Sequence, residues 1–239
     1  MVGNKTTGLL LACVLSLVGA VLFPSVTNFT PAYAIDLTSN SIATADSLWV
    51  VVNKQRPLDP IQYIPSDLTT PRFGSLNSNP YGRKLRKNAA YAAIELAKAM
   101  NKDGKGVLVI QSAYRSYTEQ TAVHNREVGR FGLKAGEALA ARPGYSEHQT
   151  GLAMDVSARG QGCRIRVCFG QTKAGYWLAH NAYKYGFIVR YPNNSTATTG
   201  YQYEPWHLRF VGVELATEMK TKKVKVLELF FKLPAAPNY

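Results

Sequence analysis

Two short polar motifs place the strongest constraint on how this chain of 239 residues can fold. The first contains His148 and Asp155, and the second, much later in the chain, contains Glu204 and His207. Two histidines and one aspartate can hold a tetrahedral zinc ion and leave its fourth position open, as in catalytic zinc sites. A fold that joins the two motifs would therefore create a metal site, with the glutamate as a candidate base.

The choice of the third ligand stays open at this level. Asp155 follows His148 by seven residues across a glycine-containing turn, and such a pair alone more often forms a hydrogen bond. His207 strengthens the metal interpretation, because Pro205 forbids a helix through its segment and leaves it extended. If Glu204 replaced Asp155 as the ligand, the site would keep its metal and lose its base.

The N-terminus has the features of a signal peptide, predicted to span residues 1–34. Lys5 gives a positive start, residues 8–23 form an apolar run, and Ala32 and Ala34 frame a cleavage site of the A-x-A type. The run is short for a membrane span, which needs about 20 apolar residues, although an uncleaved anchor is an alternative. We therefore expect an exported protein.

The cysteines support an oxidising compartment. Removal of the signal peptide takes away Cys13 and leaves Cys163 and Cys168. An even number of cysteines in an exported protein favours a disulfide between them. A second metal site is the rival interpretation, but no histidine lies within ten residues of either cysteine.

The formal net charge of +13 at pH 7 is high for an exported chain, and the signal peptide contributes only Lys5 to it. This charge is typical of a protein that meets an anionic surface such as a bacterial cell wall, and simple solubility is the alternative explanation. No basic block is long enough to indicate nucleic-acid binding. We expect a monomer.

Hydrophobic periodicity predicts one domain at residues 48–239, preceded by a flexible linker at residues 35–47 that is rich in Ser, Thr and Asn. Prolines keep residues 56–80 in a loop. Helices are expected at residues 82–101, 116–128, 133–141, 173–185, from 212 onward and at 224–233, and strands or extended segments at residues 48–52, 107–110, 152–156, 187–191, 201–204 and 207–210. The fold class is α+β, a small antiparallel sheet with helices packed around it.

Two further residues bear on the chemistry. In the expected mechanism zinc lowers the pKa of a bound water to about 7, and Glu204 takes the proton as the water attacks a peptide carbonyl. Arg115, in a turn after a strand, is the best candidate to stabilise the oxyanion, with a surface salt bridge as its alternative role. Glu147 is a rival base, but its place beside a strand predicts an outward side chain.

Three motifs resemble the VanY-type D-alanyl-D-alanine carboxypeptidases, zinc peptidases of bacterial cell walls. They are residues 112–117 with Gln120, residues 146–155 and residues 203–212. The resemblance runs from about Trp49 to Gly212, and it covers neither the 163–168 loop nor the chain after Lys220. It implies roles for individual residues: His148, Asp155 and His207 bind one Zn²⁺ per chain, Glu204 is the base, Arg115 polarises the substrate, and Ser146 and Gln120 line the peptide site.

The resemblance implies release of the terminal D-alanine from peptidoglycan stem peptides. From their chemistry, we expect Arg115 together with the donors Ser116, Gln120 and Ser146 to bind the anionic end of the substrate. An L,D-carboxypeptidase or a peptidoglycan endopeptidase of the same family is the alternative. A non-catalytic wall-binding module with structural zinc is a third possibility. Glu204 and Arg115 weigh against this module, because a structural zinc site needs neither and fills its fourth position with a protein ligand.

Overall fold

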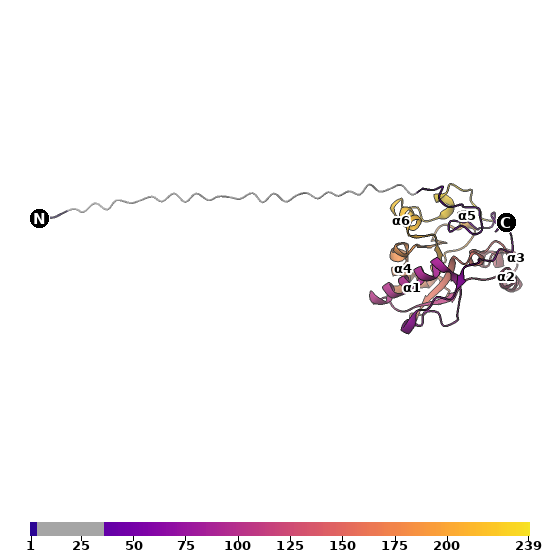
Figure 1. The fold of residues 1–239 in the computed structure, drawn as a ribbon, viewed down its shortest axis with the longest axis horizontal. Coiled ribbons are helices and arrows are strands. Elements are labelled where there is room, and N and C mark those ends of the chain that lie inside the picture. Colours follow the sequence, from indigo (N-terminus) through magenta and orange to yellow (C-terminus); the bar gives the residue numbers. More distant parts are fainter. Residues whose placement is uncertain (4–35) are drawn as a thin grey trace. The chain divides into compact units, whose positions relative to one another are not determined.

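The structure is a computed structural model that describes residues 1–3 and 36–239 (Figure 1). The predicted signal peptide lies outside the described residues, apart from residues 1–3. Within the described part of the chain, no helix combines the length and the apolar character needed to cross a bilayer.

An antiparallel sheet of four strands forms the centre of the domain, in the order β3-β4-β6-β5. Its strands are β3 (Leu108–Ser112), β4 (Ala153–Ala158), β6 (His207–Phe210) and β5 (Phe187–Val189). A second, two-stranded sheet pairs β1 (Leu68–Thr69) with β2 (Leu85–Arg86). The α+β prediction is confirmed, including the small size of the sheet and its antiparallel pairing.

Helices surround this sheet, with α1 and α4 on one side of the domain and α2 and α3 together on the other (Figure 1). The α-helices are α1 (Lys87–Lys102), α2 (Tyr117–Phe131), α3 (Leu133–Leu139), α4 (Lys173–Asn181), α5 (Thr196–Thr199), α6 (Val213–Thr221) and α7 (Leu227–Phe230). The 3-10 helices are η1 (Gly74–Leu76), η2 (Glu147–Thr150), η3 (Val167–Gln171) and η4 (Ala182–Tyr185).

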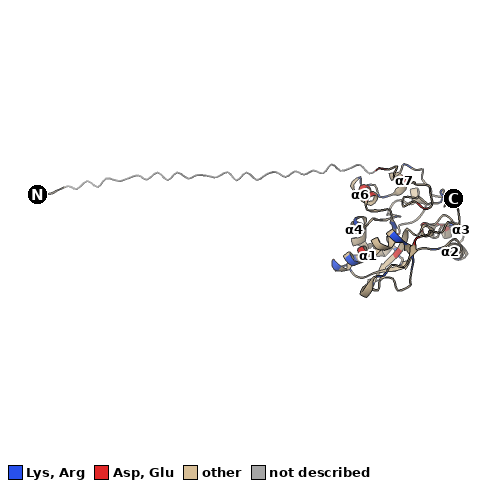
Figure 2. Cartoon of the chain, in the orientation of Figure 1, with Lys and Arg blue, Asp and Glu red and all other residues tan. Residues whose placement is uncertain are grey.

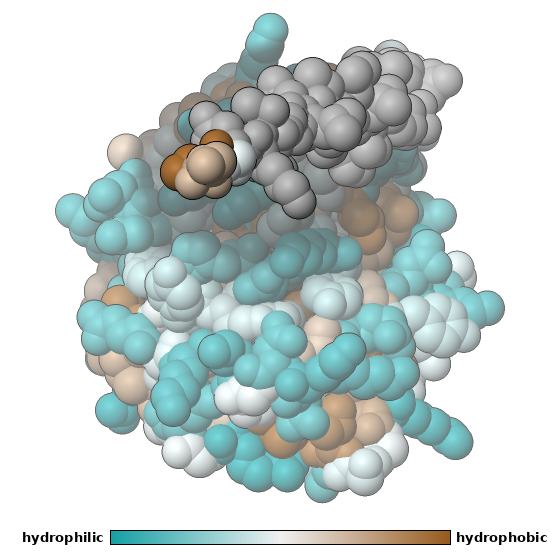
Figure 3. Space-filling view, turned by 90° about the vertical axis from the view of Figure 1, so that its left-hand side faces the viewer, coloured by the Kyte–Doolittle hydropathy of each residue, from teal (hydrophilic) through white to brown (hydrophobic). Residues whose placement is uncertain are grey.

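Helix α1 shows how the sequence pattern becomes packing. Ala89, Ala93, Leu96 and Met100 recur at helical spacing and belong to the core that also contains the inward residues of β3 and β4. Its lysines, which belong to the residues coloured blue in Figure 2, are exposed. The face drawn in Figure 3 is largely hydrophilic. The helix begins at Lys87 rather than near residue 82, because the two residues before it pair with β1 as strand β2.

The start of α2 is fixed by a capping box that the sequence predicts. The Ser116 hydroxyl accepts a hydrogen bond from the Glu119 backbone N–H at 3.2 Å. The Glu119 carboxylate in turn accepts one from the Ser116 N–H at 2.7 Å. The two backbone N–H groups would otherwise be unpaired at the start of the helix. The cap places Arg115 immediately before the helix, at the end of the segment that follows β3.

The strand predicted at residues 48–52 is wrong, although Trp49, Val50 and Val52 are buried as expected. Leu48 and Trp49 lie in a turn, and residues 50–52 pair with no strand. The Arg209 guanidinium donates instead to the carbonyl oxygens of Leu48 and Val50, at 3.0 and 2.8 Å. Side chains, rather than a neighbouring strand, therefore satisfy this buried backbone. Residues 201–204 likewise form no strand.

The predicted linker is also partly different from expectation. Ala45 is only 3% exposed, and the Ile42 carbonyl accepts hydrogen bonds from Val51 and Arg56 at 3.0 and 2.9 Å. Asp46 forms an ion pair with Arg86 at 3.1 Å. The end of this segment is thus packed against the domain, because its few apolar and acidic groups find partners that local composition cannot reveal.

Candidate metal centre and active site

The two polar motifs meet at the middle of the sheet. Strands β4 and β6 pair in a register that places Asp155 opposite His207. His148 lies in η2, and Gly151, with a φ of +68°, connects η2 to β4. An added Cβ at Gly151 would come within 2.9 Å of the Arg86 side chain, so only glycine permits this turn. The turn brings His148 back over the strand that carries Asp155.

Three side chains converge at this point and are almost fully buried: His148 is 5% exposed, Asp155 8% and His207 4%. One carboxylate oxygen of Asp155 lies 3.1 Å from His148 Nε2, and the other lies 3.1 Å from His207 Nδ1. One candidate ligand atom from each residue lies within 4.8 Å of the others. With bonds of about 2.0–2.1 Å, tetrahedral zinc holds its ligands about 3.3 Å apart. The donor set and its spacing therefore fit a zinc ion.

The two histidines face this centre through different nitrogens. His148 Nδ1 lies 2.7 Å from the Ala113 carbonyl oxygen; since a carbonyl only accepts, Nδ1 carries the proton and leaves Nε2 free as a ligand atom. His207 has the opposite arrangement, with Nδ1 toward Asp155 and Nε2 at 3.4 Å from a carboxylate oxygen of Glu147. Each ring thus has a partner on the side away from the centre, as ligating histidines usually do.

The electrostatics of the centre favour a cation. Burial alone would raise the pKa of Asp155, but the two histidines hold it well below its usual range. Burial alone would lower the pKa of His207, yet its hydrogen bonds to Asp155 and Glu147 raise it to about 9. The three side chains thus form a site that stabilises positive charge, as a metal-binding site must.

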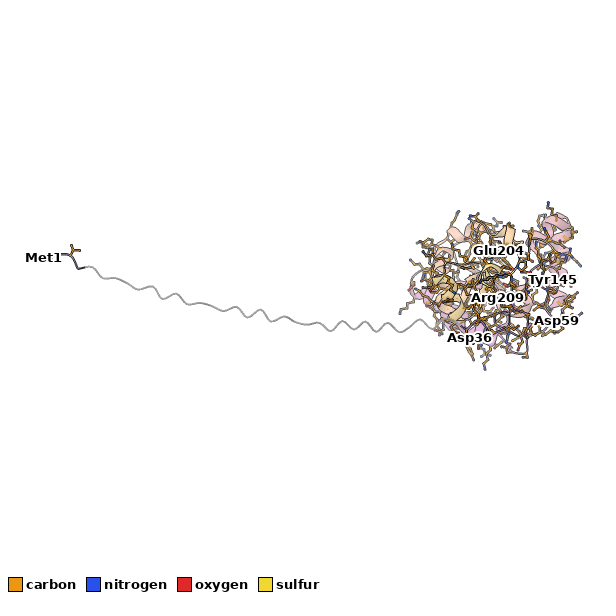
Figure 4. The ribbon with its side chains drawn as sticks, turned by 90° about the horizontal axis from the view of Figure 1, so that it is seen from above. Met1, Asp36, Asp59, Tyr145, Glu204 and Arg209 are labelled. Carbon is orange, nitrogen blue, oxygen red and sulfur yellow. A yellow bond between two sulfur atoms is a disulfide. The ribbon has the colours of Figure 1, made fainter. Side chains whose placement is uncertain are left out.

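Glu204 lies beside this centre as a fourth group, a carboxyl separate from the three candidate ligands. Its carboxylate is 3.9 Å from His207 Nδ1 and its residue is 8% exposed. Figure 4 shows it within the body of the domain. Burial raises the pKa of Glu204 to about 8, against the opposing effect of His207. Because it stands outside the His–Asp–His set, this carboxyl remains available for proton transfer.

Arg115 supplies a cation at the edge of the same centre. Its guanidinium approaches Asp155 at 4.0 Å. The Gln120 side-chain oxygen accepts from it at 2.6 Å and the Ser112 hydroxyl at 3.0 Å. The Gln120 amide also donates to the Ala141 carbonyl at 2.7 Å. These contacts anchor the arginine from behind and fix its orientation.

A cavity of about 300 Å³ opens over these groups. Its walls come from α2, α3, η2 and the segment between β5 and β6. The lining includes Gln120, Val123, Arg126, Glu127, Leu139, Ala140, Ala141, Ser146, Ile165, Tyr191, Tyr201, Gln202 and Trp206. An extended, mostly polar ligand could therefore lie across the metal centre and reach the charged side chains of α2.

Comparison with known proteins gives this site its context. A family model described as VanY, D-alanyl-D-alanine carboxypeptidase, matches residues 82–213, more than half of the chain. The chain belongs to the VanY family. The YodJ protein of Bacillus subtilis (strain 168) is 41% identical over 194 residues, which cover 81% of this chain and 70% of YodJ.

Two solved structures show that this VanY-family chain shares its fold with enzymes of different specificity. The LdcB LD-carboxypeptidase matches with a TM-score of 0.69 at 41% identity, over 79% of this chain and 87% of LdcB. A mutant of the vancomycin resistance D,D-pentapeptidase VanY, in complex with Zn(II), matches with a TM-score of 0.63 at 29% identity, over 76% and 97% of the two chains.

The structure brings most of the predicted site residues of this VanY-family chain together. Ser146 and Gln120 line the cavity, as do Arg115 and Glu204. Ser116 differs: its hydroxyl is engaged in the cap of α2 and it does not line the cavity. The same local pattern that predicts its cap therefore explains why it is not free for a ligand. The predicted disulfide between Cys163 and Cys168 is present.

The environment of Glu147 differs from the outward orientation that its sequence position predicts. Its side chain is fully buried rather than outward, and it accepts hydrogen bonds from Arg190 and Arg209, each at 2.7 Å. Burial alone would raise its pKa, but the two arginines hold it well below the usual range. Both arginines lie far from Glu147 in the sequence, so no residue near Glu147 indicates that its carboxylate is buried and paired.

Proposed function

We propose that this chain is a zinc carboxypeptidase that removes the terminal D-alanine from peptidoglycan stem peptides ending in D-Ala-D-Ala. One observation carries the proposal: a buried His–Asp–His set lies beside a separate buried carboxyl, Glu204, and an anchored cation, Arg115, at the base of one cavity. A purely structural zinc site requires neither of the two additional groups. The VanY family supplies the substrate class.

One zinc ion per chain would be held by His148 Nε2, an Asp155 oxygen and His207 Nδ1, the atoms that face one another in the structure. Zinc at this site would supply a Lewis acid that polarises the scissile carbonyl and lowers the pKa of a water to about 7. Asp155 is suited to the ligand role because it lies between both histidines, whereas Glu204 approaches only one of them.

Glu204 has the position required of the general base. Its carboxylate accepts a proton from the attacking water and returns that proton to the amine of the departing D-alanine. A cation held by the three ligands would lower the pKa of Glu204 from its raised value, so that the base is ionised near neutral pH. Arg115 faces the charge that develops on the carbonyl oxygen, and its anchors Gln120 and Ser112 hold it there without rearrangement.

An L,D-carboxypeptidase is the second candidate, and a specific observation favours it. The LdcB structure matches this chain at higher identity and a higher TM-score than the D,D-pentapeptidase VanY does. Both activities release a terminal D-alanine, but they act on stems of different length and differ in the residue that carries the attacked carbonyl. This residue is a D-alanine in the pentapeptide stem and an L-residue in the tetrapeptide stem.

We further propose that the protein works as an exported monomer. Its strong positive charge suits the anionic surface of a cell wall, where the stem peptides are found. No part of the proposed chemistry needs a second chain, because the base, the cation and the three ligands all come from the same domain.

The decisive experiment compares defined stem peptides. The zinc-loaded protein is incubated with a pentapeptide and a tetrapeptide stem, and the products are identified by mass spectrometry. Loss of one alanine from the pentapeptide, with the tetrapeptide left intact, is the expected result, and a chelator should abolish it. Faster loss of alanine from the tetrapeptide would establish the L,D-activity instead, and cleavage within the stem would establish an endopeptidase.

A further inference from the structure

A cluster of four charged side chains lies beneath the metal centre, and the proposed chemistry leaves its purpose unexplained. It consists of Glu147, Arg190, Arg209 and Glu228, hereafter the buried charge cluster. In each ion pair of the cluster both side chains are fully buried. Charges in such a position are costly unless each is paired. Replacement of such a cluster by apolar side chains is often neutral or stabilising. Stability of the fold therefore does not explain the cluster, and a role in the neighbouring site is the alternative.

The cluster is fully paired and electrically balanced. One Glu147 oxygen accepts from both arginines, each at 2.7 Å. Arg190 also forms a two-pronged pair with Glu228, at 2.9 and 2.6 Å, and the Asn53 amide donates to Glu228 at 3.0 Å. Two positive and two negative groups thus cancel, and the second oxygen of Glu147 is left without a partner inside the cluster.

That second oxygen faces His207. It lies 3.4 Å from His207 Nε2, on the side of the ring opposite to the proposed ligand atom Nδ1. A neutral imidazole that offers Nδ1 to a metal carries its proton on Nε2. A carboxylate at that position can accept this proton's hydrogen bond, fix the tautomer and hold the ring in its plane. Glu147 is poorly suited to act as the base, because the two arginines engage one of its oxygens and His207 faces the other.

We propose that Glu147 is the positioning residue for the metal ligand His207, with Arg190 and Arg209 holding its carboxylate in place. The proposal rests on the zinc site described under the proposed function. It assigns Glu228 a more distant role, since Glu228 touches Arg190 but does not contact His207. Asn53 and Glu228 both lie outside residues 82–213, so chain segments beyond the family match complete the pairing of Arg190.

Two substitutions of equal chemistry test this assignment. Glu147→Gln removes the carboxylate that faces His207, whereas Glu228→Gln removes the other carboxylate of the same buried charge cluster and serves as the matched control. Zinc affinity is measured by chelator competition on the full chain, without substrate, and the visible spectrum of the cobalt-substituted protein reports the ligand geometry. Circular dichroism verifies that each variant is folded.

We expect Glu147→Gln to weaken zinc binding by about 10- to 100-fold and to change the cobalt spectrum. Glu228→Gln should lower thermal stability but change zinc affinity far less. Equal losses of affinity in the two variants, or an unchanged affinity and spectrum in Glu147→Gln, would overturn the assignment. Because no substrate is used, this result is independent of whether the protein cleaves D,D- or L,D-peptides, or any peptide at all.

A measurement on the unmodified protein covers the case in which Glu147→Gln does not fold. Long-range proton–nitrogen NMR spectra of the zinc-loaded chain distinguish the two nitrogens of each histidine. We expect a protonated, slowly exchanging Nε2 on His207 and a protonated Nδ1 on His148. A His207 ring protonated at Nδ1 would leave Glu147 nothing to accept and would refute the proposal.

Discussion

Asp155 and His207 occupy directly opposed positions on the antiparallel strands β4 and β6. Their side chains meet at 3.1 Å on the same face of the sheet. Opposed residues of a pair point to the same side, so this register alone joins two proposed ligands that lie 52 residues apart in the sequence. A shift of the register by one residue would send one of the two side chains to the other face. The metal centre is therefore part of the sheet rather than an addition to it.

The role of Glu204 predicts a separation of catalysis from metal binding. Glu204→Gln keeps the size of the side chain but removes the base, so activity should fall by at least about 10²-fold. Zinc content, measured by metal analysis, should stay near one per chain because the three ligands are intact. His148→Ala and His207→Ala should instead lose both activity and zinc. Substantial activity in Glu204→Gln would contradict the assignment of the base.

The raised pKa values predict how the metal-free protein responds to pH. Burial lowers the pKa of His207, but its hydrogen bonds raise it overall from an ordinary 6.5 to about 9, and burial raises that of Glu204 from 4.5 to about 8. The folded state then binds more protons than the unfolded state. The stabilisation from each group is complete below its ordinary pKa and is lost as the pH rises through its raised value.

Burial lowers the pKa of His148, which opposes this trend below its ordinary value, so the melting temperature of chelator-treated protein should fall most clearly between about pH 7 and pH 9. Zinc requires deprotonated ligands, so its added stabilisation should grow over the same range. Thermal unfolding of the metal-free and zinc-loaded protein at a series of pH values measures both trends. A melting temperature of the metal-free protein that rises across this range would show that these two groups do not control it.

The anchoring of Arg115 predicts that Gln120 matters for catalysis without touching the metal. Gln120→Leu removes the acceptor that lies 2.6 Å from the Arg115 guanidinium. Hydrogen bonds to charged groups contribute about 1.5–3 kcal/mol, so kcat/KM should fall by about 10- to 100-fold, with zinc content unchanged. Ser116→Ala is the control: loss of the cap should lower stability by about 1 kcal/mol and leave kcat/KM unchanged. A fall in kcat/KM for Ser116→Ala, with none for Gln120→Leu, would instead assign the Ser116 hydroxyl to the substrate site.

What the sequence can predict is largely what local patterns determine. Ser116 and Glu119 are three residues apart, so their capping box could be predicted from the sequence alone. The alternation in β4 likewise predicts that Asp155 points away from the apolar side chains of Leu152 and Met154, both of which are fully buried in the core. The candidate metal centre follows from the same motifs, because its three proposed ligands converge once the strands pair.

The remainder depends on partners that are distant in the sequence. Glu147 is buried because Arg190 and Arg209 neutralise it, and neither arginine stands out locally. Val50 is buried and Leu48 is partly buried although neither forms a strand, since the Arg209 guanidinium donates to their carbonyl groups. In each case a long-range side-chain contact overrides the local preference. The sequence pattern therefore predicts an outward Glu147 side chain and a strand at residues 48–52, and neither is found.

The Cys163–Cys168 disulfide predicts an effect on substrate binding rather than on chemistry. Ile165, between the two cysteines, lines the cavity, but no metal-facing group lies in this loop. The double variant Cys163→Ser with Cys168→Ser should retain zinc and kcat and should raise KM by a few fold. Steady-state kinetics measure this, and mass spectrometry after alkylation without reductant checks the bond in the exported protein. Two alkylated thiols there would mean that the disulfide does not form.

The final prediction concerns the free end of the substrate. A carboxypeptidase must recognise the carboxylate one residue beyond the attacked carbonyl, and this cavity offers Arg115, Arg126 and the Ser146 hydroxyl among its lining. Charge-assisted hydrogen bonds contribute about 1.5–3 kcal/mol each. Amidation of the peptide's C-terminus should therefore lower kcat/KM by about 10- to 100-fold for each lost contact. Matched free and amidated pentapeptides provide the measurement. Equal rates would show that the terminal carboxylate is not recognised and would favour an endopeptidase, because such an enzyme cuts within the stem and needs no free end.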